Sequence, residues 1–433
     1  MDPIEKMRAE WDERARSDPY FYAAFARRGQ TTADFFASAA DTLPTLEAEF
    51  QRLPPAPPEG WRALEIGCGP GRLMRPMSAH FGEIHGVDIS PEMLELARRE
   101  LAGVPHAQVH LTPQSDLSMF GTGSFDFVYS YTVFQHIPER EIVLGYLRES
   151  LRVLKPGGIL CCQLRGASPL ETEMQRESDT WTGCSFGRSE LIAFSRETQF
   201  QIVALSGLET QYLWTTWRRP VSDPLPDSPA PLNRKAELKA VTASGGGGMQ
   251  IPQRGRDACV SLWIDGLSQG FHLGSLEVSF GQRRQRGCYL SPVGETGACQ
   301  LNAMVPEGVP AGETAVGVLA DGATIPSPCM VTIVPVQFDP TVVSVTDAIN
   351  LESRYRIETR GVKVTLEGIE QPNEVSFRVG RKRAAIVQVE SKDPVSLKYE
   401  YSFYLPPGVV QGVVTLGIRA GGRDLDPIAV DVI

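Results

Sequence analysis

A glycine-rich turn lies between an apolar segment and a helix-like segment near residue 70. Residues 61–66 have the pattern of a short buried strand, residues 67–71 read Gly-Cys-Gly-Pro-Gly, and residues 72–81 have the pattern of a helix. Glycine accepts unusual backbone angles and lets the main chain approach a ligand closely. Amides at the start of the next helix attract anionic groups. The turn predicts a nucleotide-binding α/β fold, which pyrophosphate-binding Rossmann enzymes also use.

Two acidic residues near this turn help to distinguish a pyrophosphate-binding Rossmann enzyme from a protein that binds another kind of nucleotide. Glu65 stands just before the first glycine, a position that suits an ammonium group better than a pyrophosphate. Asp88 ends a second predicted strand some twenty residues further on, where an acid can accept both hydroxyls of a ribose. The two acids favour a nucleoside ligand that carries an amino group.

Strand and helix patterns continue to alternate beyond Asp88, as expected for an open α/β sheet. Ser90 and Pro91 read as an N-cap and a first helical residue. The predicted segments that follow are a helix at 92–101, strands at 108–111 and 124–130, a helix at 139–151, and an apolar strand at 159–164 that follows a Lys-Pro-Gly-Gly turn.

Four motifs in this region, read in order, resemble those of class I S-adenosylmethionine-dependent methyltransferases. They are LEIGCGPGRL, GVDISPEMLELAR, SFDFVYSYTVFQHIP and LRVLKPGGIL. The resemblance is strong over residues 60–165 and extends in outline over 1–220. It implies an enzyme with a Rossmann-like, seven-stranded sheet that binds S-adenosylmethionine. Its reversed terminal hairpin would comprise residues 201–205 and 211–217.

The resemblance also implies roles for individual residues. Glu65 would hold the amino group of the cofactor, and Asp88 its ribose. Many relatives have a Gly-Asp pair after the third strand, where this chain reads Thr112-Pro113-Gln114-Ser115. Gln114 or Ser115 would therefore make the adenine contact in place of that pair. Ile89 would pack on the adenine, with Asp116 and Leu117 at its edge. The other implied cofactor contacts are Gly67, Cys68 (as a small loop residue rather than a nucleophile), Gly69, Gly71 and Ser130.

His136 is the candidate catalytic residue. It follows the fourth strand, at the edge of the sheet where such folds place their chemistry, and it could deprotonate a hydroxyl or an amine. Relatives often carry a residue there only to shape the loop, and methyl transfer depends mainly on alignment. The aromatic N-terminal segment resembles the lid of small-molecule methyltransferases. The candidates for lid or substrate contacts are Arg14, Tyr20, Tyr22 and Tyr131.

The second half of the chain contains an internal repeat of short β patterns. Residues 260–267 parallel 362–369, residues 276–281 parallel 375–380, and residues 305–318 parallel 405–418. Agreement in order and spacing indicates two related units of all-β structure. They resemble bacterial immunoglobulin-like domains of the IPT/TIG kind, the alternative being an unrelated barrel. The predicted domains are 1–220 with a helical lid at 1–58, a Pro- and Gly-rich linker at 221–250 with a possible helix at 233–241, and sandwiches at 251–337 and 338–433.

Charge and cysteine content bear on partners. The formal net charge of −10 argues against nucleic acid or an anionic membrane as the main partner. The eight cysteines show no CxxC spacing, so no metal site is expected. The absence of an export signal or an apolar span favours a cytoplasmic protein.

We expect methyl transfer to O or N of a small or carbohydrate-like acceptor. The β units would bind a protein or glycan partner, or mediate dimerisation. A protein methyltransferase and a non-catalytic cofactor-binding scaffold are the alternatives.

Overall fold

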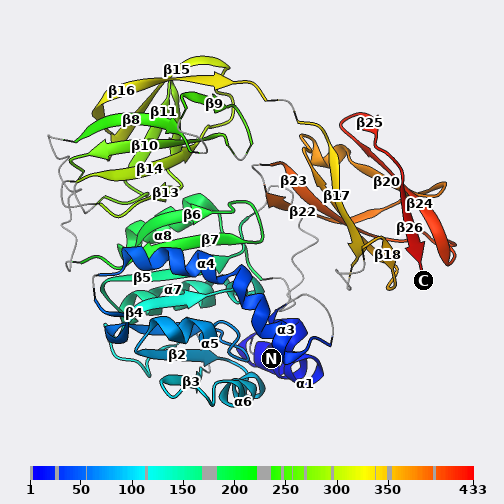
Figure 1. Cartoon of the computed structure of the whole chain (residues 1–433), viewed down its shortest axis with the longest axis horizontal. Coiled ribbons are helices and arrows are strands. Elements are labelled where there is room, and N and C mark those ends of the chain that lie inside the picture. Colours follow the sequence, from blue (N-terminus) through cyan, green and yellow to red (C-terminus); the bar gives the residue numbers. More distant parts are fainter. Residues whose placement is uncertain are drawn as a thin grey trace.

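The computed structural model describes residues 3–433 except 25–28, 55, 113–115, 168–182, 222–235, 245–247, 256, 268–270, 294–296, 337, 349–353 and 394–395. Figure 1 shows three parts: an α/β unit (residues 3–221), β unit 1 (236–336) stacked against one edge of it, and β unit 2 (338–433) beside them. Within the described ranges, no helix is long and apolar enough to cross a membrane.

The α/β unit is built on a twisted sheet in the order β3-β2-β1-β4-β5-β7-β6. Strand β7 is antiparallel to both of its neighbours, and the remaining pairs are parallel. The order reverses between β1 and β4, so their carboxyl ends border a crevice suited to a ligand. The strands are β1 (Arg62–Ile66), β2 (Glu83–Asp88), β3 (Ala107–Leu111), β4 (Phe125–Ser130), β5 (Leu154–Leu164), β6 (Gln201–Ser206) and β7 (Leu213–Arg218).

Helices cover both faces of this sheet through two hydrophobic clusters. Leu64 and Ile66 point to the face covered by α7 and α8, whereas Ala63 points to the face covered by α4, α5 and α6. The helices are α1 (Pro3–Ser17), α2 (Pro19–Ala23), α3 (Thr32–Ala37), α4 (Leu43–Glu47), α5 (Met74–Met77), α6 (Pro91–Glu100), α7 (Arg140–Val153) and α8 (Arg188–Thr198), with short 3-10 turns η1 (Ser38–Asp41), η2 (Ala48–Arg52), η3 (Pro58–Gly60), η4 (Ser78–His80) and η5 (Phe134–His136).

Two local predictions for helices can be compared with the structure. The hydroxyl of Ser90 accepts a hydrogen bond from the amide of Met93 at 3.2 Å, and Pro91 is the first residue of α6, which confirms the predicted cap. The helix predicted at 72–81 is shorter: α5 has only four residues and continues as a 3-10 turn.

The sheet does not end at β6, where a seven-stranded sheet was expected. Among the described residues it has eleven strands, because β13 (Tyr289–Leu290) pairs with β6 and leads on to β14 (Cys299–Met304), β10 (Cys259–Asp265) and β8 (Glu237–Ala243). The amide of Leu205 also donates to the carbonyl of Cys288 at 2.8 Å. An edge strand has unpaired backbone groups, and β unit 1 satisfies those of β6. One hydrophobic cluster spans the junction, so the two units share a core.

The two β units have the same topology, which supports the predicted repeat. In each, a four-stranded sheet faces a second sheet across a hydrophobic core: β8-β10-β14-β13 against β12-β11-β15-β16-β9, and β17-β19-β23-β22 against β21-β20-β24-β26-β18. The strands not yet given are β9 (Gln250–Pro252), β11 (Leu276–Phe280), β12 (Arg283–Arg286), β15 (Gly312–Ala320), β16 (Ala323–Val334), β17 (Thr341–Asp347), β18 (Arg356–Ile357), β19 (Gly361–Glu367), β20 (Ser376–Val379), β21 (Lys382–Ala384), β22 (Ile386–Asp393), β23 (Lys398–Tyr404), β24 (Gly412–Ala420), β25 (Arg423–Asp424) and β26 (Ile428–Val432), with one 3-10 turn, η7 (Pro372–Glu374).

The linker predicted at 221–250 is partly wrong. Residues 237–243 form β8, which pairs with β10, where a short helix was considered possible. Leu238 and Val241 are buried in the core of β unit 1, and this tertiary contact outweighs any local helical preference. The rest of the predicted linker includes 222–235 and 245–247, which lie outside the described residues.

Candidate active site

A cavity of about 850 Å³, including its open side, lies at the carboxyl ends of β1, β2 and β4. Helix α1 and the segment after it cover one side. The residues that line it are Met7, Trp11, Tyr22, Ala23, Glu65, Ile66, Gly67, Cys68, Gly69, Pro70, Arg72, Leu73, Asp88, Ile89, Met93, Thr112, Tyr131, Thr132, Val133, His136, Ile137 and Tyr146.

The glycine turn reaches the cavity because its first residue has no side chain. Gly67 has φ +72°, and a Cβ atom there would lie 2.2 Å from Cγ2 of Val133. The amides of Gly67 and Cys68 both donate to the carbonyl of Val87, at 2.7 and 3.0 Å. The turn is thereby pinned to β2 and leaves an open space in front of it. Gly71 belongs to the turn but does not line the cavity.

Glu65 lies at the bottom of the cavity, with only 3% of its surface exposed. Its carboxyl accepts a hydrogen bond from the hydroxyl of Tyr129 at 2.9 Å. Burial raises the pKa of Glu65 to about 8, although the bond from Tyr129 and the charge of Arg72 oppose the rise. A buried carboxyl of this kind becomes ionised when a cation binds beside it.

Arg72 is a cavity residue that the sequence prediction missed. Its guanidinium is buried, lies 5.5 Å from the ring centre of Tyr131, and donates to the carbonyl of Ser38 at 3.2 Å. Burial lowers the pKa of Arg72, and the charges of Tyr131 and Glu65 oppose that effect. A carboxyl and a guanidinium in one cavity are complementary to the ammonium and carboxylate of an amino acid.

Asp88 connects the middle of the glycine turn to the residues that follow β2. Its carboxylate accepts hydrogen bonds from the amides of Gly69 and Ser90, both at 2.9 Å. Burial raises the pKa of Asp88, and these two bonds act in the opposite direction. Because a carboxylate offers about four acceptor positions, Asp88 keeps capacity for a ribose diol in the cavity.

The predicted adenine-side residues are only partly in the wall. Ile89 lines the cavity, and so does Thr112, which was not among the predicted contacts, but Asp116 and Leu117 do not. The carboxylate of Asp116 accepts from the amide of Ser118 at 2.7 Å and from its hydroxyl at 2.9 Å. Gln114 and Ser115 lie outside the described residues.

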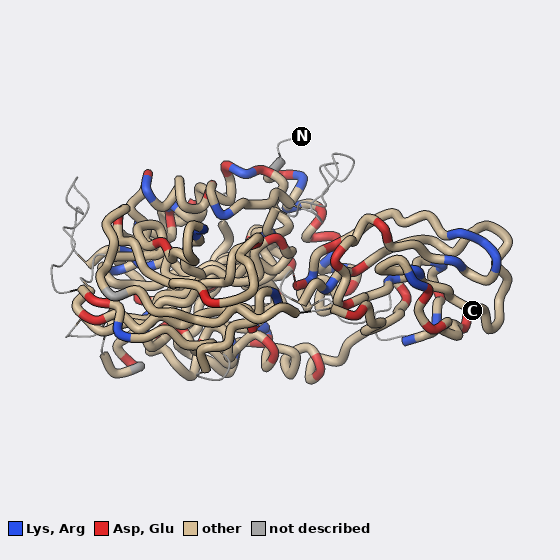
Figure 2. The backbone as a smooth tube through the Cα atoms, turned by 90° about the horizontal axis from the view of Figure 1, so that it is seen from above, with Lys and Arg blue, Asp and Glu red and all other residues tan. Residues whose placement is uncertain are grey.

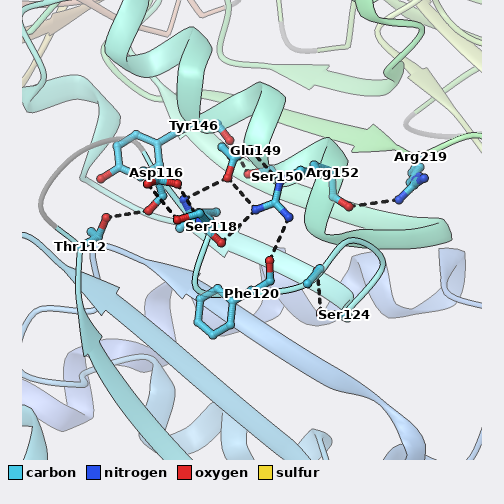
Figure 3. Close-up of polar contacts among 12 residues, drawn as sticks. Thr112, Asp116, Ser118, Phe120, Ser124, Tyr146, Glu149, Ser150, Arg152 and Arg219 are labelled. Carbon is cyan, nitrogen blue, oxygen red and sulfur yellow. Dashed lines mark hydrogen bonds and ion pairs between the residues drawn. The ribbon is translucent and has the colours of Figure 1, made fainter.

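Helix α7 holds the loop that contains Asp116 and Ser118, as Figure 3 shows. The amide of Leu117 donates to Glu149 at 3.0 Å, and Arg152 donates to the carbonyls of Leu117 and Phe120, both at 2.9 Å. Asp116 and Leu117 therefore shape the loop rather than contact the cavity. Ser130 is also structural: its hydroxyl donates to the carbonyl of Ile66 at 2.9 Å and ties β4 to β1.

Helix α1, which belongs to the segment predicted as a lid, contributes to the cavity wall, through residues that differ partly from those predicted. Met7 and Trp11 line the cavity, as does Tyr22. Arg14 lies behind them, 4.7 Å from the ring centre of Trp11. Tyr20 points elsewhere: it stacks on Phe35 and donates to Glu100 at 3.3 Å. Tyr131 lines the cavity and stacks on Trp214, with ring centres 5.2 Å apart.

The lid is attached to α6 by polar contacts next to Asp88. The hydroxyl of Ser90 donates to Asp12, and Arg16 pairs with Glu92 at 3.1 Å. Since Ser90 also caps α6, these contacts attach the lid to the helix that follows Asp88, the acid predicted to bind the ribose.

We expect Asp12→Ala to weaken binding of S-adenosylhomocysteine about 2–5-fold, because it removes the hydrogen bond from Ser90, worth about 0.5–1 kcal/mol, and the longer one from the amide of Glu92. Calorimetry at constant pH measures the change, with the exposed Glu13→Ala on the same helix as control. Equal affinities for both variants would contradict a role of this contact in closing the lid.

His136 lines the cavity as predicted and is 9% exposed. Its ring lies 5.6 Å from that of Trp11 in an edge-to-face arrangement. The neighbouring Thr132 has φ +57°, an uncommon conformation for a β-branched residue. Among the described residues, no group of three or more His, Cys, Asp and Glu side chains could hold a metal.

Comparison with known proteins agrees with this geometry. Residues 64–162 match the family model described as "Methyltransferase domain". These residues form a methyltransferase domain that uses S-adenosylmethionine.

The curated relatives of this methyltransferase domain carry similar names. A "Ubiquinone biosynthesis O-methyltransferase" of Xanthomonas oryzae pv. oryzae is 29% identical over 173 residues, which are 37% of this chain and 69% of that protein. One of Cereibacter sphaeroides is 32% identical over 140 residues, 31% of this chain and 55% of that protein. Among solved structures, geranyl diphosphate C-methyltransferase from Streptomyces coelicolor A3(2) is 15% identical, covers 51% of this chain and 98% of its own, and has a TM-score of 0.38.

Proposed function

We propose that the chain transfers the methyl group of S-adenosylmethionine to an oxygen or nitrogen of a small acceptor. The observation that carries this proposal is one cavity lined both by charged residues and by aromatic residues with a histidine. Glu65, Arg72 and Asp88 match the cofactor. Trp11 of the lid, and Tyr131 and His136 from the segment after β4, also line the cavity, and an acceptor beside them would meet the sulfonium methyl. Holding both reactants in line in one enclosed space supplies most of what methyl transfer requires.

Oxygen is the preferred acceptor atom in this proposal. The relatives named above are O-methyltransferases, and His136 can hydrogen-bond a hydroxyl. The stacked rings of Tyr131 and Trp214 offer a flat face beside the cavity, which suits an aromatic or carbohydrate-like ring.

We further propose that the two β units are immunoglobulin-like domains and that β unit 2 binds a protein or glycan partner. In support, Arg378 on β20 is directly opposite Arg383 on β21, and both are exposed. Like charges opposite each other destabilise a strand pair, so this pair favours an anionic ligand. Figure 2 shows a run of Lys and Arg at the far end of this unit. A tethered partner raises its own concentration near the cavity, and dimerisation through the unit is the other possibility.

Isotopic labelling tests the methyl transfer. Extract incubated with the protein and methyl-labelled S-adenosylmethionine is expected to give labelled small molecules, and Asp88→Ala is expected to abolish most of that label. Label on proteins instead would support a protein methyltransferase whose partner is held by the β units. Label in neither fraction, with cofactor binding intact, would support a non-catalytic scaffold.

A further inference from the structure

Gln163 lies at the end of β5, fully buried, and the orientation of its amide is determined by backbone groups. Its Oε1 accepts from the amide of Thr132 at 2.9 Å. Its Nε2 donates to the carbonyls of Leu164 at 2.9 Å and Gln211 at 2.6 Å. A backbone N–H can only donate and a carbonyl can only accept. The oxygen and nitrogen of Gln163 can therefore not be exchanged.

The orientation of Gln163 determines that of Gln135. Oε1 of Gln135 lies 2.8 Å from Nε2 of Gln163, so the two N–H groups of Gln163 are shared among three acceptors, and the atom of Gln135 that faces this NH₂ group has to be the oxygen. The nitrogen of the Gln135 amide must then point the other way, and it lies 3.2 Å from Nε2 of His136. An amide nitrogen only donates, so Nε2 of His136 has to accept. A histidine nitrogen that accepts carries no proton, and the proton of the neutral ring is on Nδ1.

The same glutamine also supports the strained part of the cavity wall. Thr132 lines the cavity with φ +57°, a conformation that costs of order 1–3 kcal/mol and persists only where neighbours hold it. The bond from its amide to Gln163 is one such restraint. One buried side chain thus positions both Thr132 and His136.

We propose that Gln163 and Gln135 are positioning residues that keep His136 neutral, with its proton on Nδ1 and Nε2 as a hydrogen-bond acceptor. This inference concerns the protein alone, and only its catalytic consequence rests on the proposed function. Because Gln135 occupies the Nε2 lone pair, that nitrogen does not take the proton of the acceptor. Methyl transfer to a hydroxyl forms an O–CH₃ bond, breaks the S–CH₃ bond of the sulfonium, and yields S-adenosylhomocysteine, with the hydroxyl proton passing to water.

The proposal has a consequence for the titration of His136. Protonation at Nε2 would place its N–H against the NH₂ group of Gln135, which disfavours the protonated ring. The titratable side chains that share the cavity are Glu65, Cys68, Asp88, Arg72, Tyr22, Tyr131 and Tyr146. From the lid, Arg14 lies over Trp11, which touches the His136 ring.

Nitrogen NMR of the full chain labelled with ¹⁵N-histidine tests the proposal, with His136→Asn to assign the signal. In the wild type we expect the proton on Nδ1. Gln135→Glu places a carboxylate against Nε2, and we expect the proton to move to Nε2 and the pKa of His136 to rise by about 1 unit or more. Gln211→Glu is the matched control, because only its main-chain carbonyl bonds to Gln163.

A proton on Nε2 in the wild type would overturn the proposal, and this measurement needs no variant to fold. So would equal pKa values for His136 in Gln135→Glu and Gln211→Glu. The experiment requires no acceptor, so its outcome is separate from that of the labelling test.

Discussion

Glu65→Gln is expected to weaken binding of S-adenosylmethionine by about 1.5–3 kcal/mol, or roughly 10–150-fold, because it removes the buried partner of the cofactor ammonium. The shape of the side chain and its capacity to accept from Tyr129 are kept. Calorimetry at pH 8 measures the loss. Tyr129→Phe is the matched control, because it deletes the hydrogen bond to Glu65 and keeps the carboxyl group. An affinity within twofold of the wild type would contradict an ammonium contact for Glu65.

The pH dependence of Glu65 gives a second readout of the same variant. With its pKa near 8, Glu65 is mostly protonated in the free protein at pH 7, and cofactor binding must release that proton. Affinity of the wild type is therefore expected to rise from pH 6 to 8, by up to about tenfold per unit, and this rise disappears in Glu65→Gln. Above pH 8 the cofactor amine itself loses its proton, and affinity falls again.

The raised pKa of Glu65 also determines how the stability of the folded protein changes with pH. A carboxyl whose pKa is raised by folding stabilises the protein most at low pH, and this contribution is lost as pH rises through the folded value. The cofactor-free wild type is thus expected to lose stability between about pH 4.5 and 8. At pH 9, Glu65→Gln is expected to melt at a higher temperature than the wild type, whereas at pH 4.5 the two should melt alike.

Asp88→Ala is expected to cost about 1–3 kcal/mol of S-adenosylmethionine affinity, or roughly 5–150-fold. The substitution removes the ribose acceptor and leaves the amides of Gly69 and Ser90 without their acceptor. Calorimetry with S-adenosylmethionine measures the loss, and Glu95→Ala, which removes an exposed acid on the neighbouring helix α6, is the control.

Asp88→Asn separates the two effects of that substitution. It keeps one acceptor oxygen and the shape of the side chain, so we expect an affinity between those of the wild type and Asp88→Ala. If circular dichroism shows a folded Asp88→Ala protein with unchanged affinity, Asp88 does not bind the ribose.

The α/β unit could largely be predicted because its signals are local. A glycine with positive φ at residue 67, a Ser-Pro start for α6 and an acid at the end of β2 each belong to a few consecutive residues. Backbone sterics and capping act over such short distances. Glu65, Asp88 and His136 were found in this way, and all three line the cavity.

Other predictions failed because they required the position of a neighbour. Tyr20 and Tyr22 are equivalent candidates in the sequence, but only Tyr22 reaches the cavity, since Tyr20 is held by Phe35 and Glu100. Ser130 and Asp116 could bind a cofactor chemically, but their side chains bond to backbone groups of Ile66 and Ser118 instead. An aromatic lid could be predicted, but not which rings face inward.

What the sequence by itself determined is the cofactor fold, the two acids beside the glycine turn, and the repeat of two β units. Tertiary structure alone decided that β13 extends the sheet past β6, that Arg72 joins Glu65 in the cavity, and that Gln163 orients His136 through Gln135. These contacts join residues far apart in the chain or depend on the direction of buried amides. Such choices are made by burial and hydrogen-bond satisfaction in the folded state, which no local pattern records.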